Sequence, residues 1–262
     1  MTKRERVKPR IYGIEHHESH WEMQEWNLDP RQFHIYLVGE PIEYDVDDEN
    51  PRDEPGVEYQ MSTRLIKNLQ ILSSINPERP ILVHMKTCGG YWTEGMAIYD
   101  AIWACPNPVT ILNYTHARSM SSLILQAADR RVLMPHSYFL FHEGTLSAYG
   151  TAKFFHSYAD WDNKVVRPTM LEIYVNTLKQ KGKFHRWSPE RIKQMLQDLM
   201  NKKEDVYLTA QEAVEWGFAD AIFDRNWPAL TKFSRRFKKT PVVSQTQKQP
   251  DKTGPSDKVE PA

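Results

Sequence analysis

Short apolar segments of β type alternate with helical segments along most of the chain, and this alternation limits the fold more than any other feature. The β-type runs are 34–38, 81–85, 109–112 and 138–142. The helical stretches are 59–74, with an apolar stripe, 93–104, a segment that begins at Ser119, and 150–181. Repeated strand–helix units imply right-handed crossovers and a largely parallel sheet. The chain is therefore predicted to be an α/β protein.

The two ends of the chain differ in composition from this alternating region. Residues 1–27 are polar and rich in His, Glu and Arg, and we interpret them as an N-terminal arm. Residues 229–262 are predicted to be a disordered polar tail, because from Lys238 on they are largely Lys, Gln, Thr, Ser and Pro and bury too little apolar surface to become ordered. One domain over 28–228 is expected between them. Within it, the acidic stretch 45–58 contains two prolines and is predicted to be a loop.

Local signals predict several helix boundaries. Pro168 lies inside the stretch 150–181, so a break or kink is expected near Arg167. Ser188 before Pro189 is a typical helix start. Thr209 and Glu212 have the spacing of a capping box, and Gly217 is placed to end that short helix.

Composition argues against several classes of function. Lys+Arg and Asp+Glu both number 34, which gives no support for a nucleic-acid or membrane-surface role. No apolar run approaches the roughly 20 residues of a membrane span, and no signal peptide is visible. Cys88 and Cys105 are expected to be reduced, so a cytoplasmic location is predicted. No phosphate-binding loop motif occurs, so this chain is not expected to hydrolyse nucleotides.

Two turns could carry chemistry. Gly89 and Gly90 lie between a strand and a helix, where backbone N–H groups could stabilise an oxyanion. On this feature alone, a simple tight strand-to-helix turn is the favoured interpretation. Ser119 opens a helix in Arg118-Ser119-Met120, a suitable place for a nucleophile and also for an ordinary N-cap.

The remaining candidates are acid–base groups. His142 ends an apolar strand and could act as a general base, and His116 is a rival nearer to Ser119 in sequence. Asp205 could orient the histidine, although alone it is one acid in a polar stretch. His16 and His20 could share a helix face for a metal, but a solvated arm is favoured, and no metal or cofactor is predicted.

In combination these motifs resemble the proteolytic subunit family of Clp protease. That family has a Gly-Gly turn before Gly-Met-Ala-Ile-Tyr-Asp, and here Gly89-Gly90 precedes Gly95-Met96-Ala97-Ile98-Tyr99-Asp100. Its Ala-Ser-Met corresponds to Arg118-Ser119-Met120, and its His-Gln-Pro to His142-Glu143-Gly144. Its acid precedes Phe-Leu-Ser-Ala-x-Glu-Ala-Val, which is similar to Tyr207-Leu208-Thr209-Ala210-Gln211-Glu212-Ala213-Val214 after Asp205-Val206.

The resemblance implies the Clp protease and crotonase-like fold with a protruding helical handle, and a serine endopeptidase that works without a cofactor. Its catalytic triad would be Ser119, His142 and Asp205, and its oxyanion hole Gly90 and Met120. Gly89, Glu143 and Gly144 would contact the peptide or unfolded-protein substrate. The family also implies a seven-membered ring, single or paired, and an ATPase unfoldase of the AAA+ class as the partner that uses ATP.

Departures from the family pattern keep other readings open. Val206 stands where the family often has an arginine that helps to pair two rings, and Arg118 replaces a small residue. Such changes suit a divergent or phage-borne member. The alternatives are a catalytically silent ring or capsid-assembly subunit and a crotonase-like acyl-CoA enzyme, and the complete Ser-His-Asp set argues against both.

Overall fold

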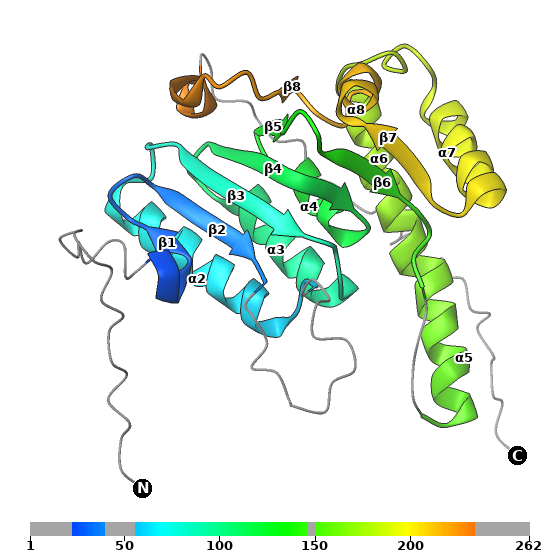
Figure 1. Ribbon diagram of the computed structural model, residues 1–262. Helices are drawn as coiled ribbons and strands as arrows, with labels where there is room; N and C mark the ends of the chain where they lie inside the picture. Colours follow the sequence, from blue (N-terminus) through cyan, green and yellow to red (C-terminus); the bar gives the residue numbers. More distant parts are fainter. Residues whose placement is uncertain (1–22, 40–55, 146–149, 234–262) are drawn as a thin grey trace, which may run out of the picture.

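The central element is a sheet whose strands are mostly parallel, as the sequence predicts (Figure 1). The computed structural model describes residues 23–39, 56–145 and 150–233, and within these ranges the sheet has eight strands. The strands are β1 (Leu28–Asp29), β2 (His34–Val38), β3 (Ile81–Thr87), β4 (Val109–Arg118), β5 (Arg130–Leu133), β6 (Tyr138–Phe141), β7 (Val206–Thr209) and β8 (Ala221–Ile222). Their order is β1-β2-β3-β4-β5-β8, with β6 pairing β4 and β7. Only the β1–β2 and β6–β7 pairs are antiparallel.

Strand β4 is the branch point of the sheet. Its first half pairs with β5, from Thr110 to Asn113, and its second half pairs with β6, from His116 to Arg118. The sequence predicts a strand only over 109–112, because the residues that follow are polar. Pairing with β3 and β6 extends β4 to Arg118, so the strand ends directly before Ser119.

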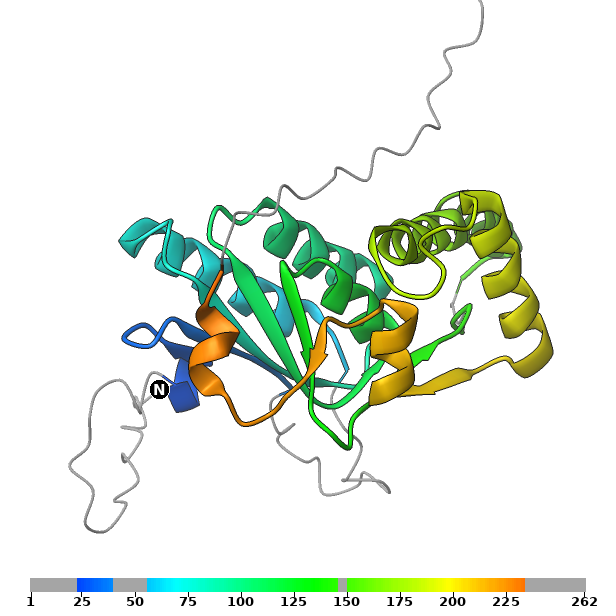
Figure 2. The same cartoon turned by 90° about the horizontal axis from the view of Figure 1, so that it is seen from above.

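Three helices cover one face of the sheet: α2 (Tyr59–Ile75), α3 (Trp92–Ala104) and α4 (Met120–Gln126) (Figure 2). The predicted stripe of α2 is buried against the core, with Leu65 and Leu72 at 2% and 0% exposure. At the start of α2 the carboxylate of Glu58 accepts hydrogen bonds from the N–H groups of Gln60 and Met61, both at 2.7 Å. These bonds satisfy two of the unpaired donors of the first helical turn.

The opposite face of the sheet is covered by the 3-10 helix η2 (Trp227–Thr231) (Figure 2). Leu230 packs there with Leu82 and Leu112, and its carbonyl accepts a hydrogen bond from Thr110 Oγ1 at 2.6 Å. On the same face the hydroxyl of Tyr114 lies 2.9 Å from His84 Nδ1. Burial lowers the pKa of His84 to about 4, so this imidazole is neutral at pH 7.

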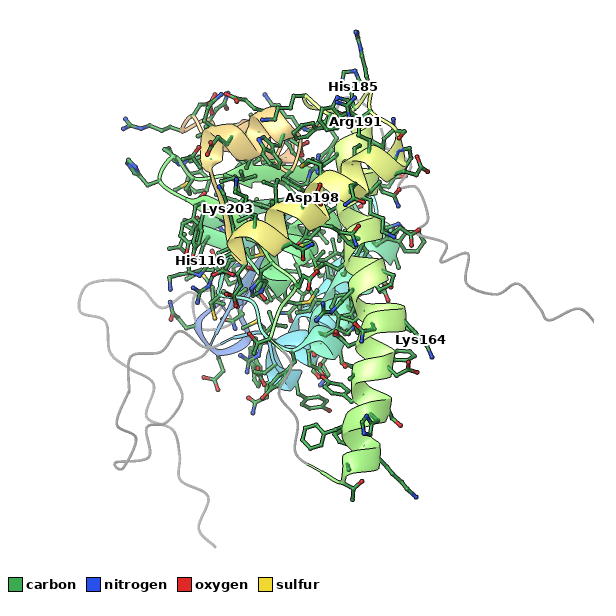
Figure 3. The ribbon with its side chains drawn as sticks, turned by 90° about the vertical axis from the view of Figure 1, so that its right-hand side faces the viewer. His116, Lys164, His185, Arg191, Asp198 and Lys203 are labelled. Carbon is green, nitrogen blue, oxygen red and sulfur yellow. The ribbon has the colours of Figure 1, made fainter. Side chains whose placement is uncertain are left out.

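The predicted handle is a helical segment that extends beyond the body of the molecule (Figures 1 and 3). It consists of α5 (Ala152–Trp161), the π-helical turn η1 (Asp162–Val166) and α6 (Arg167–Gln180). Pro168 cannot donate an N–H to a preceding carbonyl, and the α-helical hydrogen-bond pattern is interrupted immediately before it. The helical segment does not break near Arg167, as the sequence had suggested; it continues through a π turn that ends at Val166.

Two further helices complete the fold, and local signals correctly predict the start of the first and both ends of the second. Helix α7 (Pro189–Lys203) begins at Ser188, whose Oγ accepts from Arg191 N at 3.2 Å. Helix α8 (Ala210–Trp216) has the predicted capping box, and Gly217 ends it with φ 107°.

The packed unit extends slightly beyond 28–228 at both ends. Asn68 Nδ2 donates to the carbonyl of Trp26 at 2.8 Å, and Leu230 is buried. Most of the two polar ends, including His16 and His20, and most of the 45–58 stretch lie outside the described residues.

Candidate active site

Three strand ends bring the predicted triad residues to one edge of the sheet. In the parallel β4–β6 pair, Arg118 lies opposite Leu140, and Ser119 N donates to the carbonyl of Leu140 at 3.2 Å. In the antiparallel β6–β7 pair, Phe141 lies opposite Val206. The next residue after Phe141 is His142, and the residue before Val206 is Asp205, so the sheet register sets these two side by side.

The imidazole of His142 is held by a carboxylate. His142 Nδ1 lies 3.0 Å from Asp205 Oδ1, and the hydroxyl of Tyr207 donates to Asp205 Oδ2 at 3.4 Å. His142 Nε2 is buried and has no hydrogen-bond partner among the described residues. With Nδ1 occupied by the carboxylate, Nε2 is the nitrogen that remains for a reacting hydroxyl.

Ser119 occupies a sharp corner between β4 and α4. Its backbone has φ 51° and ψ −129°, a conformation that non-glycine residues rarely adopt and that costs about 1–3 kcal/mol. Although Ser119 stands at the N-cap position, its side chain makes no capping hydrogen bond. The alternative reading of Ser119 as an ordinary cap therefore loses its physical basis, and such strain is typical of functional positions.

The glycine turn lies directly against this corner. A methyl group added at Gly89 would lie 2.8 Å from Ser119 Cβ and 2.9 Å from Met120 N, so the close approach requires glycine. The Arg118 guanidinium strengthens the contact, because Nε donates to the carbonyl of Cys88 at 3.2 Å. Gly90 forms a parallel bridge with Val57 through the two neighbouring residues, which leaves its own N–H directed to the other side.

A cavity of about 1170 Å³ adjoins this corner. It is lined by Ser119, His142, Gly90, Met120, Glu143 and Gly144, among other residues. Gly89 and His116 are not part of its lining; Gly89 lies against Arg118 and Ser119, and His116 stands in β4 opposite Tyr138. Of the two histidines that the sequence offers as the base, the one that reaches the cavity is His142.

Sequence reasoning missed several residues of this site. Arg167 lines the cavity and forms ion pairs with Glu143 and, at 2.7 Å through Nε, with Asp162, so the Glu143 carboxylate faces a fixed cation. Tyr174 also lines the cavity. Both lie on α6, and their contacts with Glu143 and Ser122 join residues 24 and 52 positions apart, which no local spacing indicates. Ser121 and Ser122 did carry a local signal, because a hydroxyl in the first helical turn can bond back to the carbonyl three residues earlier.

The described residues contain no group of three or more His, Cys, Asp or Glu side chains that could hold a metal ion. A helix long and apolar enough to cross a membrane is likewise absent from this part of the chain.

Fold and site together define an α/β protein with a Ser-His-Asp constellation at the carboxyl edge of a mostly parallel sheet. The family model of Clp protease matches residues 54–226, and the chain belongs to the Clp protease family. It is 31% identical over 177 residues to the ATP-dependent Clp protease proteolytic subunit 2 of Thermobifida fusca, covering 67% of this chain and 80% of that protein. It is 28% identical over 171 residues to the ATP-dependent Clp protease proteolytic subunit of Deinococcus radiodurans, covering 64% and 77%. The resemblance drawn from the motifs is thus confirmed.

Proposed function

We propose that this chain is a serine endopeptidase in which Ser119 is the nucleophile, His142 the general base and Asp205 the residue that orients the base. The observation that carries the proposal is the 3.0 Å contact between His142 and Asp205 beside the cavity that Ser119 lines from a strained corner. Membership of the Clp protease family supports peptide hydrolysis as the reaction.

The geometry supports acyl transfer in two stages. Ser119 Oγ attacks the peptide carbonyl while His142 Nε2 takes the hydroxyl proton, and the same proton is then given to the departing amine. Asp205 keeps Nδ1 protonated and stabilises the imidazolium. The N–H groups of Gly90 and Met120 would bind the oxyanion of the tetrahedral intermediate. A water molecule then releases the acyl group by the reverse sequence.

A fluorophosphonate probe tests this proposal directly. Ser119 Oγ would attack phosphorus and displace fluoride, which leaves a stable adduct that peptide mapping by mass spectrometry can locate. We expect one adduct, on Ser119, and none in the Ser119→Ala variant. No adduct, or an adduct on another residue, would contradict the proposal and would favour a catalytically silent subunit or a crotonase-like enzyme.

Assembly into a ring of seven chains is part of the proposal, and the handle supports a contact between rings. Helix α5 buries none of its residues, and Phe154, Phe155, Tyr158 and Trp161 are 38–54% exposed. Leu171 and Tyr174, which lie further along the same helical segment, are buried in the core, because α6 packs on α4. Exposed apolar surface of this kind usually marks an interface.

We expect native mass spectrometry to find a seven-chain ring or a pair of such rings. If handles join two rings, Phe155→Glu should leave single rings, because it places a charge in that apolar contact. Lys153→Glu is the control, since it also places a glutamate on α5, with an even larger change of charge, but removes no aromatic side chain. A wild-type monomer at micromolar concentration would contradict the ring.

The names of the relatives support a proposal for the partner of this chain. Both relatives are named as ATP-dependent, so we propose an ATPase unfoldase as the partner and unfolded protein as the substrate.

Val206 is 2% exposed and packs in the core, so it offers no polar group for ring pairing. We also propose a cytoplasmic location, consistent with two cysteines that form no disulfide.

A further inference from the structure

Two consecutive serines in the first turn of α4 hold the backbone of the corner at Ser119 through hydrogen bonds. Ser121 and Ser122 are both completely buried. Ser121 Oγ accepts from Arg118 N at 2.9 Å and donates to the Arg118 carbonyl at 2.7 Å. Ser122 donates twice to the carbonyl of Ser119, from its backbone N–H at 3.0 Å and from its hydroxyl at 2.6 Å. The proposed mechanism uses neither serine.

The hydroxyl of Ser122 is in turn bonded to Tyr174. Tyr174 Oη lies 2.6 Å from Ser122 Oγ, and Tyr174 is 1% exposed. A serine hydroxyl has one proton, and that of Ser122 is directed to the Ser119 carbonyl, so Tyr174 must be the donor. The result is a directed chain from the Tyr174 O–H to the Ser122 O–H to the Ser119 carbonyl, in a site where low dielectric strengthens each bond.

These hydrogen bonds also control the direction of the Met120 N–H. The carbonyl of Ser119 and the N–H of Met120 belong to one peptide unit, which is planar and trans, so the two groups point in opposite directions. Holding the carbonyl toward Ser122 therefore holds the Met120 N–H away from Ser122, on the side of the corner where Gly89 lies close to Met120 N. At this strained corner the orientation needs support from outside the local backbone.

We propose that Tyr174 and Ser122 are positioning residues, which hold the Ser119–Met120 peptide so that the Met120 N–H meets the developing oxyanion. The inference rests on the proposed function, since it requires Ser119 to be the nucleophile. The ring of Tyr174 is separately fixed by packing against Phe141 and Phe218, at centroid distances of 5.9 and 5.5 Å. The hydroxyl can therefore be removed while the ring stays in place.

The test compares Tyr174→Phe, Ser122→Ala and the double variant in hydrolysis of a fluorogenic peptide, with active sites titrated by the fluorophosphonate probe. We expect kcat per titrated site to fall about 5- to 20-fold in each variant, as for the weakening of one hydrogen bond in the transition state, with KM changed less than about twofold. The double variant should be no slower than Ser122→Ala, because the two hydroxyls act in one chain. A peptide boronate, which mimics the tetrahedral intermediate, should bind more weakly by the same factor as kcat/KM falls.

Tyr114→Phe is the matched control. It also removes one tyrosine hydroxyl that has a hydrogen-bond partner, His84, but on the other face of the sheet. We expect its kcat to equal that of the wild type. Ser122→Ala changes a different element from Tyr174→Phe, so either variant can carry the test if the other does not fold.

The outcomes separate this inference from the function on which it rests. An unchanged kcat per titrated site in Tyr174→Phe and Ser122→Ala, with Ser119→Ala inactive, overturns the inference alone and leaves the peptidase in place. A lower fraction of titratable sites with normal kcat also overturns it, because it shows a purely structural role. Peptide hydrolysis that survives in Ser119→Ala overturns both.

Discussion

Peptide hydrolysis should fall by about 10⁴-fold or more in the Ser119→Ala variant, because loss of a triad nucleophile removes the acyl-enzyme route entirely. The fold should be retained. Ser119 makes no capping bond with its side chain, and the bonds that hold the corner use its backbone carbonyl and N–H. Alanine preserves these backbone bonds and, with the same Cβ, has about the same strain at this φ, so little change in stability is expected.

The measurement is the turnover of a fluorogenic peptide, with circular dichroism to confirm folding. Ser74→Ala is a matched control, since Ser74 is an exposed helical serine whose hydroxyl bonds to the carbonyl of Ile71, three residues earlier. It should retain wild-type turnover. Near-normal turnover by Ser119→Ala would show that Ser119 is not the nucleophile.

The His142→Ala variant should be as inactive as Ser119→Ala, and His116→Ala should be much less affected. His142 contacts Asp205 and lines the cavity, whereas His116 lies in β4 with its ring beside Tyr138 and does not reach the cavity lining. Because members of one catalytic unit are not additive, the double variant Ser119→Ala, His142→Ala should be no slower than either single variant.

Turnover of the same peptide checks this expectation, with each variant measured beside the wild type at one pH. His116→Ala serves as the matched control, because it makes the same change in a histidine close to Ser119 in sequence. If His116→Ala is the inactive variant and His142→Ala retains turnover, the assignment of the base is wrong.

Local physics explains which parts of the fold the sequence could predict. The capping box at Thr209, the end of α8 at Gly217 and the irregularity before Pro168 each depend on residues within a few positions. The strand–helix alternation likewise predicts the parallel sheet, since connections between parallel strands need helices. The capping box and the end of α8 appear at the predicted residues, whereas near Pro168 the helix continues through a π turn.

The shortest strands could not be predicted in this way, nor could the division of the handle into an exposed part, α5, and a buried part, α6. Strands β1 and β8 have two residues each and exist only because a neighbouring strand pairs with them. Phe154 and Tyr174 are similar aromatic residues in one helical stretch, yet one is 46% exposed and the other 1%. The difference arises because α6 packs on the core and α5 extends beyond it.

For the candidate site, the sequence by itself determined which residues had suitable chemistry, through four motifs in a family order, and it placed Ser119 at a strand-to-helix corner. Only the tertiary structure decided that His142 and Asp205, 63 residues apart, share a hydrogen bond, and that Tyr174 reaches Ser122 across 52 residues. The register of β6 against β7 and the packing of α6 on α4 set these contacts. Such contacts form only when the sheet and its helices pack on one core, because no local spacing of residues specifies a distance between separate elements.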